Sequence, residues 1–157
     1  MLPELLAISN KYNSKTKVYF YEGFERLKEL FKEIVDAGAN MTEPYLTFVG
    51  TLEMEPHMKE FLETEFIEYR MKQNTPTKAI IADNNSNYAK YHVDKHDTLI
   101  INDPIFTMGN EIVLYEGNKI GVLSYFSKEV YGLVIESEVL HTALKGMFHL
   151  IWKAYKK

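Results

Sequence analysis

The stretch GNEIVLYEGNK at residues 109–119 decides the fold, because it joins a strand-like run to a turn. Its centre is apolar and rich in β-branched and aromatic side chains, and Glu116-Gly117-Asn118-Lys119 has the composition of a hairpin turn. Two more strand-like runs follow, at residues 120–126 and 130–135. We therefore expect the whole segment to form a strand meander.

The outline of this segment resembles the signature of the phospholipase D superfamily: His, any residue, Lys, four residues of any kind, Asp, then a Gly-Ser pair seven and eight residues later. Laid on that pattern, the His position falls at Gly109, the Lys at Glu111, the Asp at Glu116, and the Gly-Ser pair at Leu123 and Ser124. Only Ser124 is retained. The alternative is a meander that matches the spacing by chance.

The exchanged residues remove the chemistry of that signature. Phosphodiester cleavage needs an imidazole to attack phosphorus and a cation to hold the phosphoryl oxygens while negative charge builds. Glycine at position 109 has no nucleophile, and glutamate at position 111 would repel a phosphate. We therefore expect no catalytic residues and no enzyme activity, and a pocket that recognises a ligand instead.

Composition places the chain among ordinary globular proteins and excludes several functions. Its 157 residues suit one domain with a real core. With 22 acidic and 18 basic residues and no long basic run, it is a poor candidate to bind DNA by itself. It has no cysteine for disulfides and no apolar run of about 18 residues for a membrane span. We expect a cytoplasmic protein without a cofactor.

Strand-like and helix-like runs alternate along the first half of the chain. Strands are expected at residues 18–21, 45–50 and 78–83, with helices over residues 24–35 and from Pro56 to about Tyr69. A further strand at residues 98–102 and a last helix capped by Ser137 complete the series. Such alternation predicts an α/β fold, with parallel strands in a mixed sheet flanked by helices.

Four short runs give a second resemblance: LPELL at residues 2–6, VYFYEG at 18–23, NEI with EGNK at 110–119, and GLVIES at 132–137 before an apolar helix that ends in Trp152. Together they resemble the effector half of TrmB-type transcriptional regulators over nearly the whole chain. The resemblance implies a phospholipase-D-like regulatory domain, homodimeric, that binds DNA only through a separate winged helix-turn-helix absent from this chain. Residues 1–17 would be an N-terminal arm or linker remnant, and residues 18–157 the effector and dimerisation domain.

Five residues are candidates for binding a small-molecule effector. Glu22 and Asp83 stand at the carboxyl ends of predicted strands, where open α/β sheets bind ligands. Asn110, Glu111 and Ser124 come from the degenerate motif. Together they would form an acidic, hydrogen-bonding cleft for a polyol, a sugar or a cation. The structural alternative is that Glu22 only favours a helix start and Glu111 only faces water.

The polar segment around residues 91–97, here called the polar excursion, contains the remaining candidate residues. On a strand, His92, Asp94 and His96 would share a face and could hold a divalent metal, but a solvated loop explains them as well, and we expect no metal. Two other functions stay open. One is a divergent phosphodiesterase that uses His92 or His96 in place of the missing imidazole. The other is a dimerisation module without a ligand.

Overall fold

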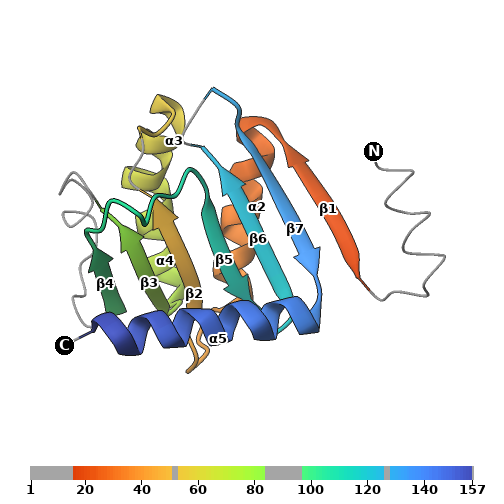
Figure 1. Ribbon diagram of the computed structural model, residues 1–157. Helices are drawn as coiled ribbons and strands as arrows, with labels where there is room; N and C mark the ends of the chain where they lie inside the picture. Colours follow the sequence, from red (N-terminus) through yellow and green to blue (C-terminus); the bar gives the residue numbers. More distant parts are fainter. Residues whose placement is uncertain (1–15, 51–52, 84–96, 126–127, 157) are drawn as a thin grey trace.

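The computed structural model describes residues 16–50, 53–83, 97–125 and 128–156, and its centre is a seven-stranded sheet with helices on both faces (Figure 1). The strands are β1 (Lys17–Glu22), β2 (Tyr45–Gly50), β3 (Thr77–Ala82), β4 (Thr98–Ile101), β5 (Glu111–Tyr115), β6 (Lys119–Ser124) and β7 (Tyr131–Glu136). The helices are α2 (Gly23–Ala37), α3 (Pro56–Phe61), the π-helix η1 (Leu62–Phe66), α4 (Ile67–Gln73) and α5 (Glu138–Tyr155). The predicted mixed sheet with flanking helices is confirmed.

The meander is present as β5, β6 and β7, which pair antiparallel in sequence order. The turn between β5 and β6 places both Glu116 (φ 54°) and Gly117 (φ 74°) in the left-handed region. Glycine adopts that conformation without a steric cost, whereas glutamate is disfavoured there because its Cβ crowds the backbone. The predicted turn residues therefore do form the hairpin.

The alternation of strands and helices along the chain suggests that β1 lies beside β2, but it does not. The strand order is β1-β7-β6-β5-β2-β3-β4, so that β2, β3 and β4 form the parallel part and β1 pairs antiparallel with β7 at the opposite edge. The meander explains this position. Because β3 and β5 take both edges of β2, β1 cannot lie beside β2, and it pairs with β7 instead.

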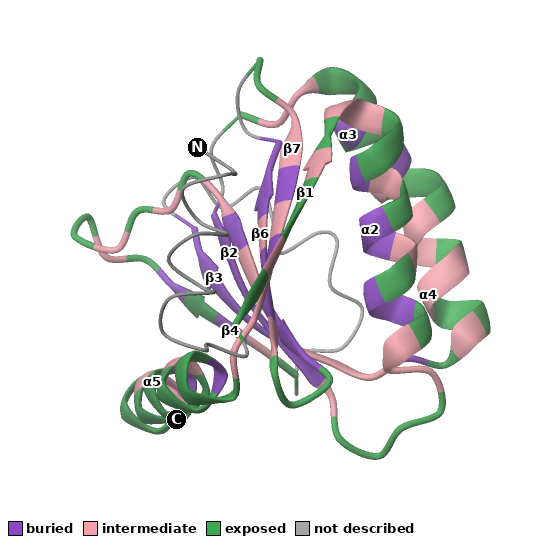
Figure 2. Cartoon of the chain, turned by 90° about the vertical axis from the view of Figure 1, so that its right-hand side faces the viewer, coloured by how far each residue is buried: buried purple, intermediate pink, exposed green. Residues whose placement is uncertain are grey.

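The two faces of the sheet are covered by different helices. Figure 2 shows α2, α3 and α4 on one side of the sheet and α5 on the other. Alternate residues of each strand point to opposite faces, so Val113 packs towards α2 while Leu114 packs towards α5. Phe148, which is fully buried, fixes α5 to the sheet. The core is therefore divided into two apolar layers.

The helices follow their apolar spacing, with one interruption. In α2 the predicted stripe is buried: Leu27, Leu30, Phe31, Ile34 and Val35. Pro56 opens α3 as expected, and Glu55 accepts a hydrogen bond from the backbone N–H of Met58 at 2.9 Å. The single helix predicted from Pro56 is instead broken by η1, and α4 ends at Asn74, which has a left-handed φ of 52°.

Two local features hold the ends of the sheet. A Cβ at Gly50 would lie 1.9 Å from the carbonyl oxygen of Met108, so only glycine lets the segment before β5 rest on the end of β2. Ser137 caps α5, because its Oγ accepts a hydrogen bond from the backbone N–H of Leu140 at 3.2 Å. This cap was predicted from the sequence.

Parts of the sequence interpretation fall outside the described residues. The arm at residues 1–15 does so, as do His92, Asp94 and His96 of the polar excursion. None of the helices in the described part of the chain has the length and apolar character that crossing a bilayer requires.

Candidate functional site

Glu111, the residue that the sequence pattern aligns with the motif lysine, is buried inside the protein. It is the first residue of β5, and its side chain points to the face of the sheet that α2 covers, with 8% of the residue exposed. Two hydroxyl groups hold its carboxyl group: Thr47 Oγ1 donates to one oxygen at 2.8 Å and the Tyr125 hydroxyl donates to the other at 2.5 Å. The prediction that Glu111 might only face water is therefore wrong.

Burial changes the acidity of this carboxyl group. Loss of hydration raises the pKa of Glu111 above its ordinary value of 4.5, and the hydrogen bonds from Tyr125 and Thr47 and the charge of Arg70 offset only part of this effect. A carboxyl group with a raised pKa can donate as well as accept a hydrogen bond. Such groups are concentrated at functional sites.

Glu111 lines a small cavity between the sheet and the helices. The cavity has a volume of about 80 Å³ and mostly apolar walls, which include Phe31, Leu62 and Phe66. Its polar groups come from the strands, from Tyr125, from Glu63 of η1 and from Arg70 of α4. An apolar hollow with a few convergent polar groups is the usual form of a small-molecule site.

Arg70 supplies the positive charge of this cavity. Its guanidinium donates to Thr77 Oγ1 at 3.0 Å, and it also forms a side-chain hydrogen bond with Tyr45. Burial raises the pKa of the Tyr45 hydroxyl, although Arg70 and Thr77 counteract the rise. The cavity is thus lined by two acidic residues, Glu63 and Glu111, and by one basic residue, Arg70.

The π-helix contributes directly to the cavity. Leu62, Glu63 and Phe66, all within η1, line it. Single π-turns inside α-helices are rare and occur frequently at functional sites. Here the π-helix lines the same cavity as the buried carboxyl group of Glu111.

The structure does not bring the five predicted ligand residues together. Asp83 is buried at the end of β3 and does not line the Glu111 cavity. Ser124 faces the α5 side of the sheet, because its neighbour Leu123 pairs with Glu111, and its hydroxyl donates to the Glu129 carbonyl at 3.3 Å.

Glu22 and Asn110 also lie away from the cavity. Glu22 is exposed at the end of β1 and shares a cross-strand row with Tyr131 and Ser124, so that it too is on the α5 side. Asn110 precedes β5 and is half-buried. A ligand role for these residues and for Asp83 and Ser124 stays a prediction.

Sequence reasoning missed the partners of Glu111. Thr47 is a polar residue within the otherwise apolar strand YLTFVG, and such a buried polar position is a usable signal. Tyr125 and Arg70 gave no comparable signal, since each lies among residues typical of its own element. Their convergence depends on the strand register, which a local pattern does not contain.

A second ionisable pair stands near the end of β6. His57 Nδ1 lies 2.7 Å from a carboxyl oxygen of Glu55, and the hydrogen bond with Glu55 raises the pKa of the imidazole. The backbone N–H of Glu55 donates to the carbonyl of Tyr125, the residue after Ser124, at 2.7 Å. Within the ranges that the structure describes, no group of three or more His, Asp or Glu side chains is placed to hold a metal ion.

The fold is shared with solved structures, whereas sequence comparison gives no relative. No protein-family model and no curated protein matches this chain. NucT from Helicobacter pylori superposes with a TM-score of 0.57 at 9% identity, over 88% of this chain and 97% of that one. Nuc from Salmonella typhimurium, a phospholipase D family member, gives 0.58 at 13% identity, over 88% and 95%. The chain has a phospholipase-D-like fold.

A third similar structure is that of TrmBL2, an archaeal chromatin protein described as showing a novel mode of DNA binding. It has a TM-score of 0.49 at 10% identity, over 98% of this chain and 60% of TrmBL2.

These comparisons correct one expectation from the sequence. The prediction that this chain is not an enzyme is contradicted by its likeness to Nuc, because Nuc is a member of an enzyme family and its fold is therefore one that supports catalysis. The alignment with the motif removes an imidazole and a lysine at two positions only, Gly109 and Glu111. Other ionisable side chains are still present, such as the pair of His57 and Glu55.

Proposed function

We propose that this chain is the effector-sensing and dimerisation domain of a TrmB-like transcriptional regulator, with DNA bound through a separate domain. The main support is the exchange at position 111. There a buried glutamate, held by Thr47 and Tyr125, replaces the lysine that the phospholipase D pattern has. A carboxyl group in an apolar cavity suits hydroxyl groups of a neutral ligand and disfavours a phosphate.

The proposed effector is a small polyol or one end of a sugar. The protonated or ionised carboxyl group of Glu111 and the guanidinium of Arg70 provide both donors and acceptors for hydroxyl groups. The volume of about 80 Å³ suits a small molecule or part of a larger one. Apolar walls formed by side chains such as Phe31 and Phe66 would contact its carbon atoms.

The outer side of α5 supports dimerisation. Val139, Met147 and Leu150 are exposed by 83%, 57% and 71%, and their spacing places them along one side of the helix. Exposed apolar stripes of this kind mark protein contacts. In the proposed mechanism an effector binds one relative pose of two subunits more tightly than another, and so changes the spacing of the attached DNA-binding domains.

Thermal unfolding in the presence of a panel of polyols and sugars tests the effector site. At least one compound should raise the Tm of the wild-type chain, and Glu111→Leu should abolish that rise while Glu60→Gln, an exposed change on α3, should retain it. A rise that persists in Glu111→Leu would show that the effector binds elsewhere. No rise with any compound would favour the dimerisation module without a ligand.

A phosphodiesterase is the second candidate, and the paired His57 and Glu55 favour it. The imidazole leaves Nε2 towards solvent, and the pair adjoins the end of β6 that carries Ser124. Hydrolysis of bis(p-nitrophenyl) phosphate should then be lost in His57→Ala and retained in Lys59→Ala, an exposed control on the same helix. His92→Ala and His96→Ala test the histidines first suggested by the sequence. Absence of hydrolysis by the wild-type chain would contradict this candidate.

A further inference from the structure

A larger hollow lies on the α5 side of the sheet, apart from the Glu111 cavity. It has a volume of about 650 Å³ and is bounded by α5, by the amino ends of β2 and β3, and by the end of β5. Leu46 pairs with Lys78 on one side and with Leu114 on the other. These three side chains therefore form one cross-strand row, which is the floor of the hollow.

The wall of this hollow is a stripe of basic residues on α5. His141, Lys145 and His149 follow one another at intervals of four residues, which places them on one side of the helix. His141 is the most enclosed of the three, with 5% of the residue exposed. Lys78 approaches the same space from the sheet, and its Nζ lies 4.2 Å from the centre of the Trp152 ring.

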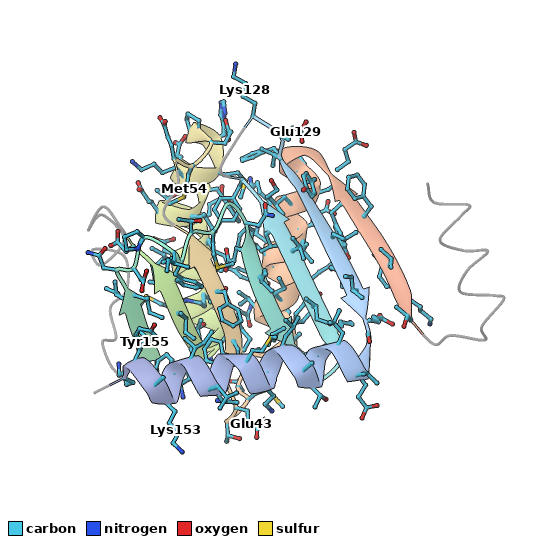
Figure 3. All side chains as sticks on the ribbon, viewed as in Figure 1. Glu43, Met54, Lys128, Glu129, Lys153 and Tyr155 are labelled. Atoms are coloured by element: carbon cyan, nitrogen blue, oxygen red, sulfur yellow. The ribbon has the colours of Figure 1, made fainter. Side chains whose placement is uncertain are left out.

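The acidic groups around the hollow compensate this charge only in part. Glu116, in the turn between β5 and β6, already forms an ion pair with Lys119 at 2.5 Å. Glu43, in the segment before β2, is exposed. The labelled Glu43 side chain in Figure 3 lies at the edge of the molecule, below α5. Positive groups therefore predominate where the two histidines stand.

The surroundings of His141 and His149 change the pKa of each imidazole. Burial and the neighbouring Lys145 lower the pKa of His141, and burial, Lys78 and Lys145 lower the pKa of His149. Both imidazoles therefore lose their proton at a lower pH than an ordinary histidine does. An anion placed among them would supply the missing negative charge and favour their protonation.

We propose that this hollow binds a phosphorylated small molecule, with its phosphate group held by Lys78, Lys145 and the imidazole of His149. Two ammonium groups and one ring nitrogen offer enough donors for the oxygens of a phosphate. The apolar floor formed by Leu46 and Leu114 would contact the organic part of the molecule. A free phosphate ion would make only the polar contacts.

Binding should be coupled to proton uptake. Because the anion raises the pKa of His141 and His149 from their lowered values, the bound state holds more protons than the empty state. Affinity for the phosphate dianion should therefore increase as the pH falls from 8 to about 6.5, which is above the second pKa of about 6 of a phosphate ester. Glu43 and Glu116 face the same space.

Titration calorimetry with phenyl phosphate, inorganic phosphate and phenol tests the proposal on the full chain. Phenyl phosphate should bind more tightly than inorganic phosphate, phenol should not bind, and the binding heat should depend on the ionisation heat of the buffer. Proton NMR should show raised pKa values for His141 and His149, with the His57 signal as an internal control at a different site. Absence of phenyl phosphate binding, or binding without proton uptake, would overturn the proposal.

Substitutions distinguish this site from general attraction of anions. Lys145→Gln and Lys78→Gln, on different elements, should each weaken phenyl phosphate about tenfold or more, the effect of losing one charged hydrogen bond. Lys153→Gln is the matched control, since Lys153 is on the same helix but does not line the hollow and points away from the sheet in Figure 3. Circular dichroism verifies that each variant is folded. An equal loss in the Lys153 variant would contradict a defined site.

Discussion

At the scale of single residues, the carboxyl group of Glu111 links stability to pH. Its pKa in the folded chain lies above the ordinary value of 4.5, so the unfolded chain releases this proton first. The stability that the group contributes is therefore fully present below a pH of about 4.5 and is lost as the pH rises through the folded-state pKa.

Replacing Glu111 by glutamine should remove this component. Glutamine does not ionise; its carbonyl oxygen can accept from one of the two hydroxyl groups of Thr47 and Tyr125, and its amide N–H can donate to the other. Urea midpoints measured from pH 4 to 8 should fall less for Glu111→Gln than for the wild-type chain, whereas Glu60→Gln should follow the wild-type curve. Parallel curves for Glu111→Gln and the wild type would contradict the buried ionisable site.

The hydroxyl of Tyr125 should contribute measurably to stability. Tyr125→Phe keeps the ring, which packs against Phe31, but leaves one oxygen of the buried Glu111 without its donor. Loss of a partner for a buried polar group costs about 1–3 kcal/mol. Chemical denaturation should show a decrease of this size, and Tyr155→Phe, on an exposed tyrosine of α5, should change stability by much less.

The candidate site was foreseeable from the sequence only in part, and the reason lies at this scale. Glu111 was identified because it replaces a charged motif residue. Its partners Thr47 and Tyr125 come from other segments of the chain and meet it only through the pairing of β5 with β2 and β6. The same register places Ser124 on the opposite face, which the linear motif spacing does not reveal.

At the scale of elements, Gly50 is a test of how the segment before β5 packs. A methyl group there would meet the backbone of Met108, which cannot rotate away as a flexible side chain can. Gly50→Ala should therefore destabilise the fold by about 1–3 kcal/mol or more, the range for overpacking. Differential scanning calorimetry measures the effect.

Gly146 provides the opposite expectation within α5. A Cβ at this position would have no neighbour within 4 Å, and alanine favours the helix interior over glycine by about 1 kcal/mol. Gly146→Ala should therefore raise stability by roughly that amount. Unchanged stability in Gly50→Ala would contradict the packing described around Gly50, and destabilisation by Gly146→Ala would contradict the open space described at Gly146.

The elements themselves were largely predictable, because each depends on a local pattern. Apolar spacing predicted the helix α2, and the turn composition at residues 116–118 predicted the hairpin. The π-helix η1 and the partner of β1 were not predictable. The first interrupts an apolar spacing that is typical of one continuous helix, and the second depends on pairing between segments that are far apart in the sequence.

At the scale of the whole molecule, the apolar stripe on α5 predicts a homodimer. Leu150→Glu would place a charge in the centre of that contact, and such central positions typically account for 2 kcal/mol or more, about a 30-fold change in affinity. Sedimentation should therefore show a dimer for the wild type and a monomer for Leu150→Glu at the same concentration. Glu60→Lys, an exposed change on α3 at the other face of the sheet, should stay dimeric.

The position of β1 has a consequence for how this chain is synthesised. Lys17 at the start of β1 pairs with Glu136 at the end of β7, so the first of the described strands pairs with the last of them to be synthesised. Contacts between such distant segments slow folding, because a long loop must close before they form. Until then the backbone of the nascent β1 has no sheet neighbour, and this period is when a cellular chaperone would have the most reason to act.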